Sequence, residues 1–119
     1  MRVFARSKYR AVKLDTPDGK FDSGLEYKRW LYLKALEQGK EIANLKRQVP
    51  YLLIPPQKGK DGKVLFKECK YVADFEYDDL RTGEHIVEDT KGVVLPEFRL
   101  KQKMMYFFHG IEVKIVKRW

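Results

Sequence analysis

Apolar and polar residues alternate along two neighbouring stretches in the second half of the chain. Residues 71–77 read Tyr-Val-Ala-Asp-Phe-Glu-Tyr, and residues 85–92 read His-Ile-Val-Glu-Asp-Thr-Lys-Gly. Both are rich in the β-branched and aromatic residues that favour strands. Turn-prone residues 78–84 separate them, so the pattern predicts an antiparallel β-hairpin.

The length of the connecting loop decides which residues of this hairpin face each other. If the loop is residues 80–83, Asp79 lies opposite Glu84, and counting back places Asp74 opposite Asp89. Opposed carboxylates approach to about 5 Å between Cβ atoms, which is destabilising without a compensating charge. A divalent cation would supply that charge.

The residues on the two faces of the hairpin also predict whether those faces are buried. Val72 shares a face with Asp74, and Val87 shares one with Asp89, while aromatic residues occupy the other face. We therefore expect both faces to be buried, as at the centre of an α/β sheet. The alternative is that the carboxylates form the solvated face of an amphipathic hairpin.

The rest of the pattern predicts one α/β domain over residues 1–119, with the order helix, three strands, helix, strand. The expected elements are a turn at residues 16–19, a helix from Ser23 to about Gln38 ended by Gly39, a strand over 45–54, a Pro/Gly/Lys loop over 55–62, the two hairpin strands, a helix over 97–109 begun by Pro96 and ended by Gly110, and a strand over 111–116.

Charge narrows the class of partner. Lysine and arginine outnumber aspartate and glutamate by 25 to 17, a net charge of +8, which favours a polyanion such as DNA. No stretch has the ~20 apolar residues of a membrane span, and the first residues lack the apolar core of a leader, so we expect a cytoplasmic protein without a membrane partner. Basic residues 1–13 are either a flexible arm on DNA phosphates or a frayed terminus.

Lys91 completes a small candidate site. It follows Asp89 by two residues, so both side chains point to one face of the strand. Two acids and a lysine indicate a metal-dependent hydrolytic site. With one cysteine, Cys69, and two histidines, structural zinc is not expected, and any metal should be a hard ion on oxygen ligands.

Asp74 followed by the triplet Asp89-Thr90-Lys91, in this order of elements, resembles the PD-(D/E)XK nuclease superfamily. The chain is also similar to small phage and prophage proteins with a Holliday-junction-resolvase-like or RecB-like nuclease core. The resemblance implies an αβββαβ, restriction-endonuclease-like fold with a central mixed sheet flanked by helices. It also implies Mg²⁺, which Mn²⁺ can replace, held by Asp74, Asp89, the Thr90 carbonyl and Glu26, with Lys91 orienting the attacking water.

Two features of the sequence each allow a functional interpretation and a purely structural one. Many resolvase-like members place an acidic ligand where Glu26 stands, but Ser23 and Glu26 also form a capping box, and the two interpretations are equally supported. Gln102 and Tyr106 resemble the Gln-x-x-x-Tyr motif of the RecB-like branch, and Arg99 shares their helix face. These three residues would contact the phosphate. Alternatively, Gln102 is an exposed glutamine and Tyr106 a core tyrosine beside it.

The expected function is a phage-type, Mg²⁺-dependent DNA endonuclease acting in recombination, repair or genome processing, with branched DNA as one specific substrate. Candidate phosphate contacts are Lys46, Arg47, Lys67 and Lys70. We also expect a homodimer built on Met104, Phe107 and Phe108, unless these residues are ordinary core, and a phage replication or packaging partner. The alternatives are a non-catalytic nucleic-acid-binding module on the same fold and a basic phage structural protein, and an RNA substrate stays open. Convergence of acid and lysine would distinguish the catalytic alternative.

Overall fold

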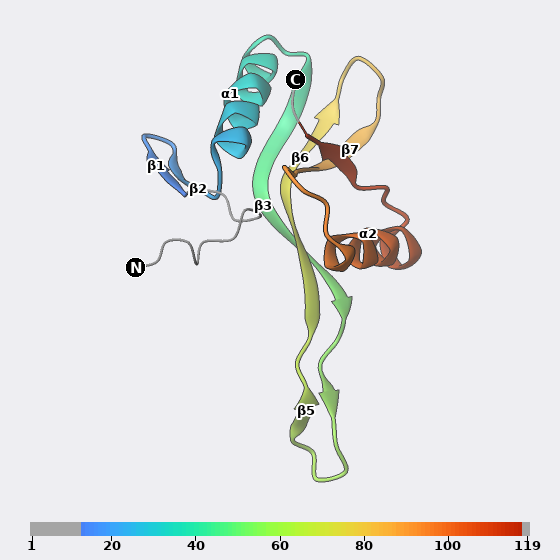
Figure 1. The fold of residues 1–119 in the computed structure, drawn as a ribbon. Helices are drawn as coiled ribbons and strands as arrows, with labels where there is room; N and C mark the ends of the chain where they lie inside the picture. Colours follow the sequence, from blue (N-terminus) through green and yellow to red (C-terminus); the bar gives the residue numbers. More distant parts are fainter. Residues whose placement is uncertain (1–12, 118–119) are drawn as a thin grey trace, which may run out of the picture.

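The computed structural model describes residues 13–117, and its central element is a four-stranded mixed sheet in the order β3-β6-β7-β8 (Figure 1). Neighbouring strands are antiparallel except β7 and β8, which are parallel and joined through α2. The elements are β1 (Leu14–Thr16), β2 (Gly19–Phe21), α1 (Gly24–Gln38), β3 (Ile42–Ile54), β4 (Gln57–Lys58), β5 (Val64–Phe66), β6 (Cys69–Asp79), β7 (His85–Thr90), α2 (Pro96–His109) and β8 (Lys114–Val116).

The order α1, β3, β6, β7, α2, β8 confirms the predicted helix, three strands, helix and strand. A parallel pair needs a crossover connection, and α2 provides it between β7 and β8. The two helices lie on either side of the β3–β6 ribbon in Figure 1. The α/β class with a mixed sheet and flanking helices is therefore confirmed.

The helix ends follow the predicted signals. Ser23 is the N-cap of α1, and its Oγ accepts a hydrogen bond from the Glu26 amide at 3.0 Å. Gly39 is the C-cap of α1, and Gly110 ends α2 in the left-handed conformation, at φ 68°. Glycine tolerates that conformation without a steric penalty, which explains why α2 ends there.

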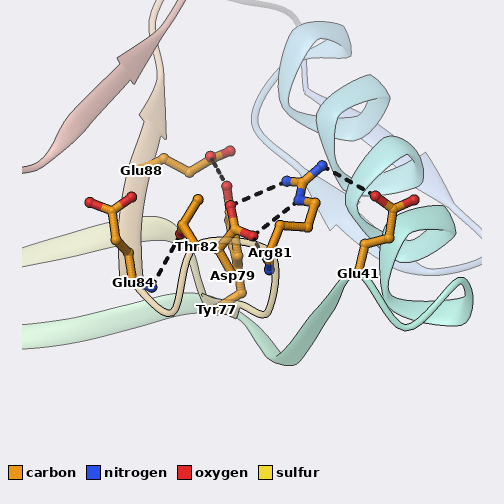
Figure 2. Close-up of polar contacts among 7 residues, drawn as sticks. All are labelled: Glu41, Tyr77, Asp79, Arg81, Thr82, Glu84 and Glu88. Carbon is orange, nitrogen blue, oxygen red and sulfur yellow. Dashed lines mark hydrogen bonds and ion pairs between the residues drawn. The ribbon is translucent and has the colours of Figure 1, made fainter.

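The β6–β7 turn confirms the predicted register (Figure 2). The Asp79 amide donates to the Glu84 carbonyl at 2.8 Å, and the ladder then runs from Asp78 opposite His85 to Phe75 opposite Glu88. The next pair in this register is Asp74 and Asp89. The loop is therefore residues 80–83, as its sequence predicts.

Side chains of the turn hold this loop length in place. Arg81 binds both oxygens of Asp79 and forms an ion pair with Glu41 at 3.4 Å, while the Thr82 hydroxyl accepts from the Glu84 amide (Figure 2). The Arg81 guanidinium also keeps the pKa of Asp79 below its ordinary value. The turn is thus tied to the chain just after α1.

Two hydrophobic clusters form the core, one with each helix. The α1 cluster contains Leu33, Ile42, Phe75, Tyr77 and Ile86, and the α2 cluster contains Leu53, Tyr71, Ala73, Val87, Phe98, Met105 and Val113. Strand β7 contributes to both clusters, so its two faces are buried as predicted. The expectation of two buried faces is wrong for β6, because Val72 is 45% exposed and Asp74 only half-buried.

Two hairpins were not expected from the sequence. β1 and β2 form a short hairpin around the predicted turn, and β4 and β5 form a second one within the predicted loop. The second hairpin prolongs β3 and β6 away from the body of the molecule (Figure 1). The Cα radius of gyration is accordingly 16.9 Å, against the ~13 Å typical of a compact domain of about 100 residues.

Candidate active site

Asp74 lies where β6 and β7 diverge, half-buried. Its Oδ2 accepts two hydrogen bonds from Thr90, one from the amide and one from the hydroxyl, both at 2.8 Å. These bonds replace the next rung of the ladder and fix the carboxylate beside the end of β7. Thr90 therefore orients Asp74 through its amide and hydroxyl, while the sequence prediction gave its carbonyl a role as a ligand.

Asp89 lies one residue before Thr90 and is only 2% exposed. Its Oδ2 accepts a hydrogen bond from the Tyr71 hydroxyl at 2.5 Å. Its Oδ1 is buried and has no hydrogen-bond partner among the described residues. A buried carboxylate oxygen without a partner is costly, so this atom is available to a ligand that brings positive charge.

Lys91 converges on the same carboxylate. Its Nζ lies 3.4 Å from Asp89 Oδ1, close enough for an ion pair although the geometry is not that of a hydrogen bond. The ammonium also lies 4.7 Å from the centre of the Phe98 ring in α2, a cation–π contact. Acid and lysine therefore meet on one face of β7, as the spacing of two predicts.

Both carboxylate oxygens of Glu26 accept hydrogen bonds, one of them near the start of α1. Its Oε1 accepts from the amide of Asp22 at 3.0 Å, so the reciprocal capping bond reaches Asp22 and not the expected Ser23. Its Oε2 accepts from the side-chain amide of Gln48 at 2.8 Å. Gln48 also lies 3.4 Å from Asp74 Oδ1 and so bridges the two acids.

Gln48 is a site residue that sequence analysis missed. It lies in β3 at φ 55°, a left-handed conformation that is uncommon for a residue with a side chain. Such strain often accompanies functional sites, because the surrounding structure must enforce it. The sequence gives no signal for it, because Gln48 follows Lys46 and Arg47 as one more polar residue in the middle of β3.

The electrostatics of the site follow from burial and from the shared neighbour Asp74. Burial raises the pKa of Asp89 to about 8, with a further increase from the charge of Asp74 that Lys91 partly offsets. Burial and the same charge raise the pKa of Glu26 to about 7. Both acids therefore hold protons more tightly than ordinary carboxyls, as expected where like charges converge without a cation.

The ligand atoms that this site offers are of the kind that binds a hard divalent cation. Asp74 and Asp89 supply carboxylate oxygens, one of them buried and unpaired, which is the ligand type that Mg²⁺ prefers. Within residues 13–117, however, no group of three or more acidic, histidine or cysteine side chains is arranged to hold a metal ion. The reason is local, since Gln48 and Asp22 occupy the oxygens of Glu26.

A pocket of about 340 Å³ opens beside Asp89 and Lys91 on the side of α2. Two further lysines line it, Lys70 from β6 and Lys101 from α2, so the lining carries three lysines and two acids, and Lys101 pairs with the second acid, Glu97, at 3.7 Å. The remaining lining residues are Tyr71, Val72, Val93, Leu95, Glu97 and Phe98. The pocket thus combines a buried carboxylate with the positive charge that a phosphate group requires.

The other predicted phosphate contacts lie elsewhere. Arg47 donates to the Lys20 carbonyl at 2.6 Å and stacks on Phe21 at 3.8 Å, so its guanidinium supports β2. Lys46 and Lys67 are exposed, on β3 and just after β5. Basic residues 1–12 lie outside the described part of the chain.

The predicted group on α2 is directed away from the pocket. The Gln102 side chain donates to the Val113 carbonyl and accepts from Arg99, both at 2.9 Å, and Tyr106 is 66% exposed. The alternative of an exposed glutamine beside a core tyrosine is wrong in detail, because the glutamine is the half-buried residue of the two. Gln102 links α2 to the chain just before β8.

The three residues predicted for a dimer interface differ in burial. Phe107 is 80% and Phe108 51% exposed, whereas Met104 packs against the α2 cluster. The interpretation as ordinary core therefore holds for Met104 and is wrong for the two phenylalanines. Among residues 13–117, neither helix has the length and hydropathy of a membrane-crossing segment.

Residues 6–118 match the model of one protein family, described as "Protein of unknown function (DUF1064)". This match spans nearly the whole chain, so the protein belongs to that family. No curated protein and no solved structure matches the chain.

Proposed function

We propose that this protein is a metal-dependent DNA endonuclease that hydrolyses phosphodiester bonds. The observation that carries the proposal is the convergence of Lys91 on the buried, unpaired oxygen of Asp89, beside Asp74. An acid, an opposed acid and a lysine at one sheet position are the groups that the PD-(D/E)XK resemblance predicts. The net charge of +8 supports a polyanionic substrate.

Asp74 and Asp89 would hold the divalent cation, with Glu26 in reach of the pair through Gln48. A bound Mg²⁺ lowers the pKa of the attacking water and neutralises charge on the phosphoryl oxygens. Tyr71 and Thr90 fix the two carboxylates by donating to Oδ2 of each. The ligand would bind the opposite oxygens, where Gln48 and Lys91 each lie 3.4 Å away. The hydrogen bonds from Tyr71 and Thr90 hold the two carboxylates in fixed orientations, which is the preorganisation that metal sites need.

Lys91 would act through its charge and position. Its ammonium is held between Asp89 and the Phe98 ring, facing the pocket where a phosphate would lie. There it would stabilise the negative charge that grows on the phosphoryl oxygens as the water oxygen bonds to phosphorus and the bond to the leaving oxygen breaks. Lys70 and Lys101 would hold the neighbouring phosphate.

The test is cleavage of linear duplex, single-stranded and four-way-junction DNA in Mg²⁺, Mn²⁺ or EDTA. We expect cleavage only with a divalent cation, and a loss of 100-fold or more in Asp74→Asn, Asp89→Asn and Lys91→Met. The matched controls Asp15→Asn and Lys40→Met alter exposed residues and should cut like the parent. Equal cleavage by the parent and the three site variants would refute the assignment.

A second readout is independent of cleavage. Mg²⁺ that binds only the folded state raises the melting temperature, in proportion to the logarithm of its concentration above its Kd. Asp15→Asn should keep this shift and Asp89→Asn should lose it. Equal shifts in both variants would remove Asp89 from the metal site.

A nucleic-acid-binding module without chemistry is the second candidate. It is favoured by the hydrogen bonds that already occupy Glu26, which leave two carboxylates and not three for a metal ion in the described residues. Such a module would bind DNA and show neither cleavage nor a Mg²⁺-dependent thermal shift. The two assays above therefore separate the candidates.

A further inference from the structure

The β4–β5 hairpin and its flanking residues, 57–68, form a projection that we call the arm. It continues the long strands β3 and β6 beyond the body of the molecule (Figure 1). Every residue of the arm is exposed except Gly59, which is half-buried. An isolated two-stranded hairpin is only marginally stable in water, so an arm without a covering element suits a role in contact with a partner.

The charge of the arm identifies the kind of partner. It carries four lysines against two acids, and the lysines are Lys58, Lys60, Lys63 and Lys67. Asp61 caps the hairpin turn by accepting from the Lys63 amide, and Glu68 pairs with Lys70 at the base of the arm, at 3.8 Å. Within residues 13–117, no ion pair joins the four arm lysines to an acid, so their charge faces solvent.

The apolar residues of the arm are equally exposed. Val64 is 55%, Leu65 64% and Phe66 59% exposed. Gln57 lies opposite Phe66 and Lys58 opposite Val64, so a bulge at Leu65 interrupts the regular alternation of β5. Proteins that bind the minor groove of DNA combine basic residues with such apolar side chains, which wedge between base steps.

The arm is continuous with the candidate site. Lys70 lies at its base and also lines the pocket with Lys91 and Lys101, so a line of positive charge runs from the pocket to the arm. Gly62 at the tip lies eight residues before Lys70. At ~3.3 Å per residue the arm reaches up to ~26 Å from the pocket, about eight base pairs of duplex.

We propose that the arm is a binding element for duplex DNA that lies in the minor groove on one side of the phosphate held at the pocket. Its lysines contact the flanking phosphates, and Val64 and Phe66 face the bases. The proposal rests on the proposed function only for the identity of the polyanion, because the arm could bind DNA whether or not the pocket cuts it.

The test uses the full chain in EDTA, so that no cleavage occurs, and a 30-base-pair duplex. We expect the triple variant Lys58→Gln, Lys60→Gln, Lys63→Gln to bind at least tenfold more weakly. Its log-log salt slope should fall by about 2.7, because each lost phosphate contact contributes about 0.9. The control triple Lys20→Gln, Lys40→Gln, Lys103→Gln removes the same charge from exposed positions outside the arm. It should lose less than threefold.

The apolar contact has its own matched pair. Phe66→Ser should weaken binding at least threefold and leave the salt slope unchanged, since no charge is lost. Leu80→Ser, in the β6–β7 turn, alters a side chain of similar exposure, 57%, and should bind like the parent. A hydroxyl-radical footprint of the parent should extend about eight base pairs to one side of the pocket, and the arm triple should lose that extension.

The outcomes separate this proposal from the proposed function. Equal losses in the two triples would refute the arm and leave the nuclease untouched. A parent that binds through the arm but never cuts would refute the nuclease and support the arm. Unchanged DNA affinity with reduced binding of anionic vesicles, of double-stranded RNA or of a second copy of the chain would assign the arm to that partner and overturn the proposal.

Discussion

Glu88 and Asp89 are neighbours in β7, equally buried at 2% exposure, and their surroundings differ completely. Glu88 points toward α1, where Arg29 donates two hydrogen bonds to it at 2.6 and 3.0 Å. The Tyr77 hydroxyl donates a third at 2.7 Å (Figure 2). Asp89 points toward α2 and receives one such bond, from Tyr71. The alternation of the strand sends the two acids to opposite faces.

The difference shows why burial alone does not identify a functional acid. A buried carboxylate with a bidentate arginine and a tyrosine has its charge compensated, and its loss would be felt as instability. A buried carboxylate with one oxygen that accepts no hydrogen bond, one ion pair and a raised pKa is only partly compensated, so its charge costs stability in the metal-free protein. Stability should therefore reside on the α1 side of β7 and reactivity on the α2 side.

The largest effect should come from breaking the compensated side. Arg29→Ala leaves Glu88 buried without its ion pair, and we expect a loss of about 3–5 kcal/mol in the free energy of unfolding. Urea denaturation measures it. Arg81→Ala removes two surface ion pairs, with Asp79 and Glu41, and should cost far less, because solvent screens both pairs. Similar losses in the two variants would contradict the contrast between the faces.

The uncompensated side should respond in the opposite direction. Asp89→Asn keeps the shape of the side chain and removes the charge that burial and Asp74 oppose. In EDTA at pH 8.5 we expect this variant to be as stable as the parent or more stable, by about 1–3 kcal/mol. Glu88→Gln should instead destabilise under the same conditions. A destabilised Asp89→Asn would show that the charge of Asp89 is compensated after all.

The stability of the metal-free parent should also depend on pH with a defined sign. The pKa of Asp89 rises from 3.8 to about 8 on folding, so the folded state binds the proton more tightly. The resulting stabilisation is complete below the unfolded pKa and is lost as the pH rises toward 8. For one such group the slope is at most ~1.4 kcal/mol per pH unit.

Chemical denaturation in EDTA between pH 5 and pH 8.5 tests this sign. The parent should lose stability across the range, and Asp89→Asn should lose less because one titrating group is gone. The remaining slope should include Glu26, whose pKa is raised to about 7. Parallel curves for the parent and Asp89→Asn would contradict the raised pKa of Asp89.

The smallest effect concerns the backbone of Gln48, which positions the Glu26 and Asp74 side chains. Gln48→Gly and Gln48→Ala both remove the side-chain amide, and they differ in their tolerance of φ 55°. The glycine variant should be more stable than the alanine variant by about 1 kcal/mol. Equal stability would mean that the strand relaxes its backbone once the amide is lost.

Much of this arrangement could be predicted because local signals specify it. The Ser23 cap, Gly39 and Gly110 set the helix ends, and the four-residue loop sets the register of β6 and β7 as far as Phe75 and Glu88. The spacing of two between Asp89 and Lys91 was sufficient to predict their convergence. Each of these predictions depends on geometry within a few residues.

The remainder depends on contacts between distant segments or on backbone conformations without a sequence signal. Gln48 bridges α1 and β6 from a left-handed backbone conformation, which the residue type glutamine does not predict. The first part of the arm was predicted as a loop over residues 55–62, because its strands are only two and three residues long and proline, glycine and lysine surround the first of them. Exposure of Val72 could not be foreseen, since a strand pattern does not show which part of a face a helix covers.

The length of the β6–β7 turn determines the register of β7 in the sheet. The backbone hydrogen bond from Asp79 to Glu84 fixes the number of residues in the loop. The contact of Arg81 with Asp79 supports it (Figure 2). The position of every residue of β7 relative to β6 depends on that number. One residue inserted there would shift the strand by half its repeat and exchange the positions of Glu88 and Asp89. A surface loop that touches neither acid thus decides which of them faces α2.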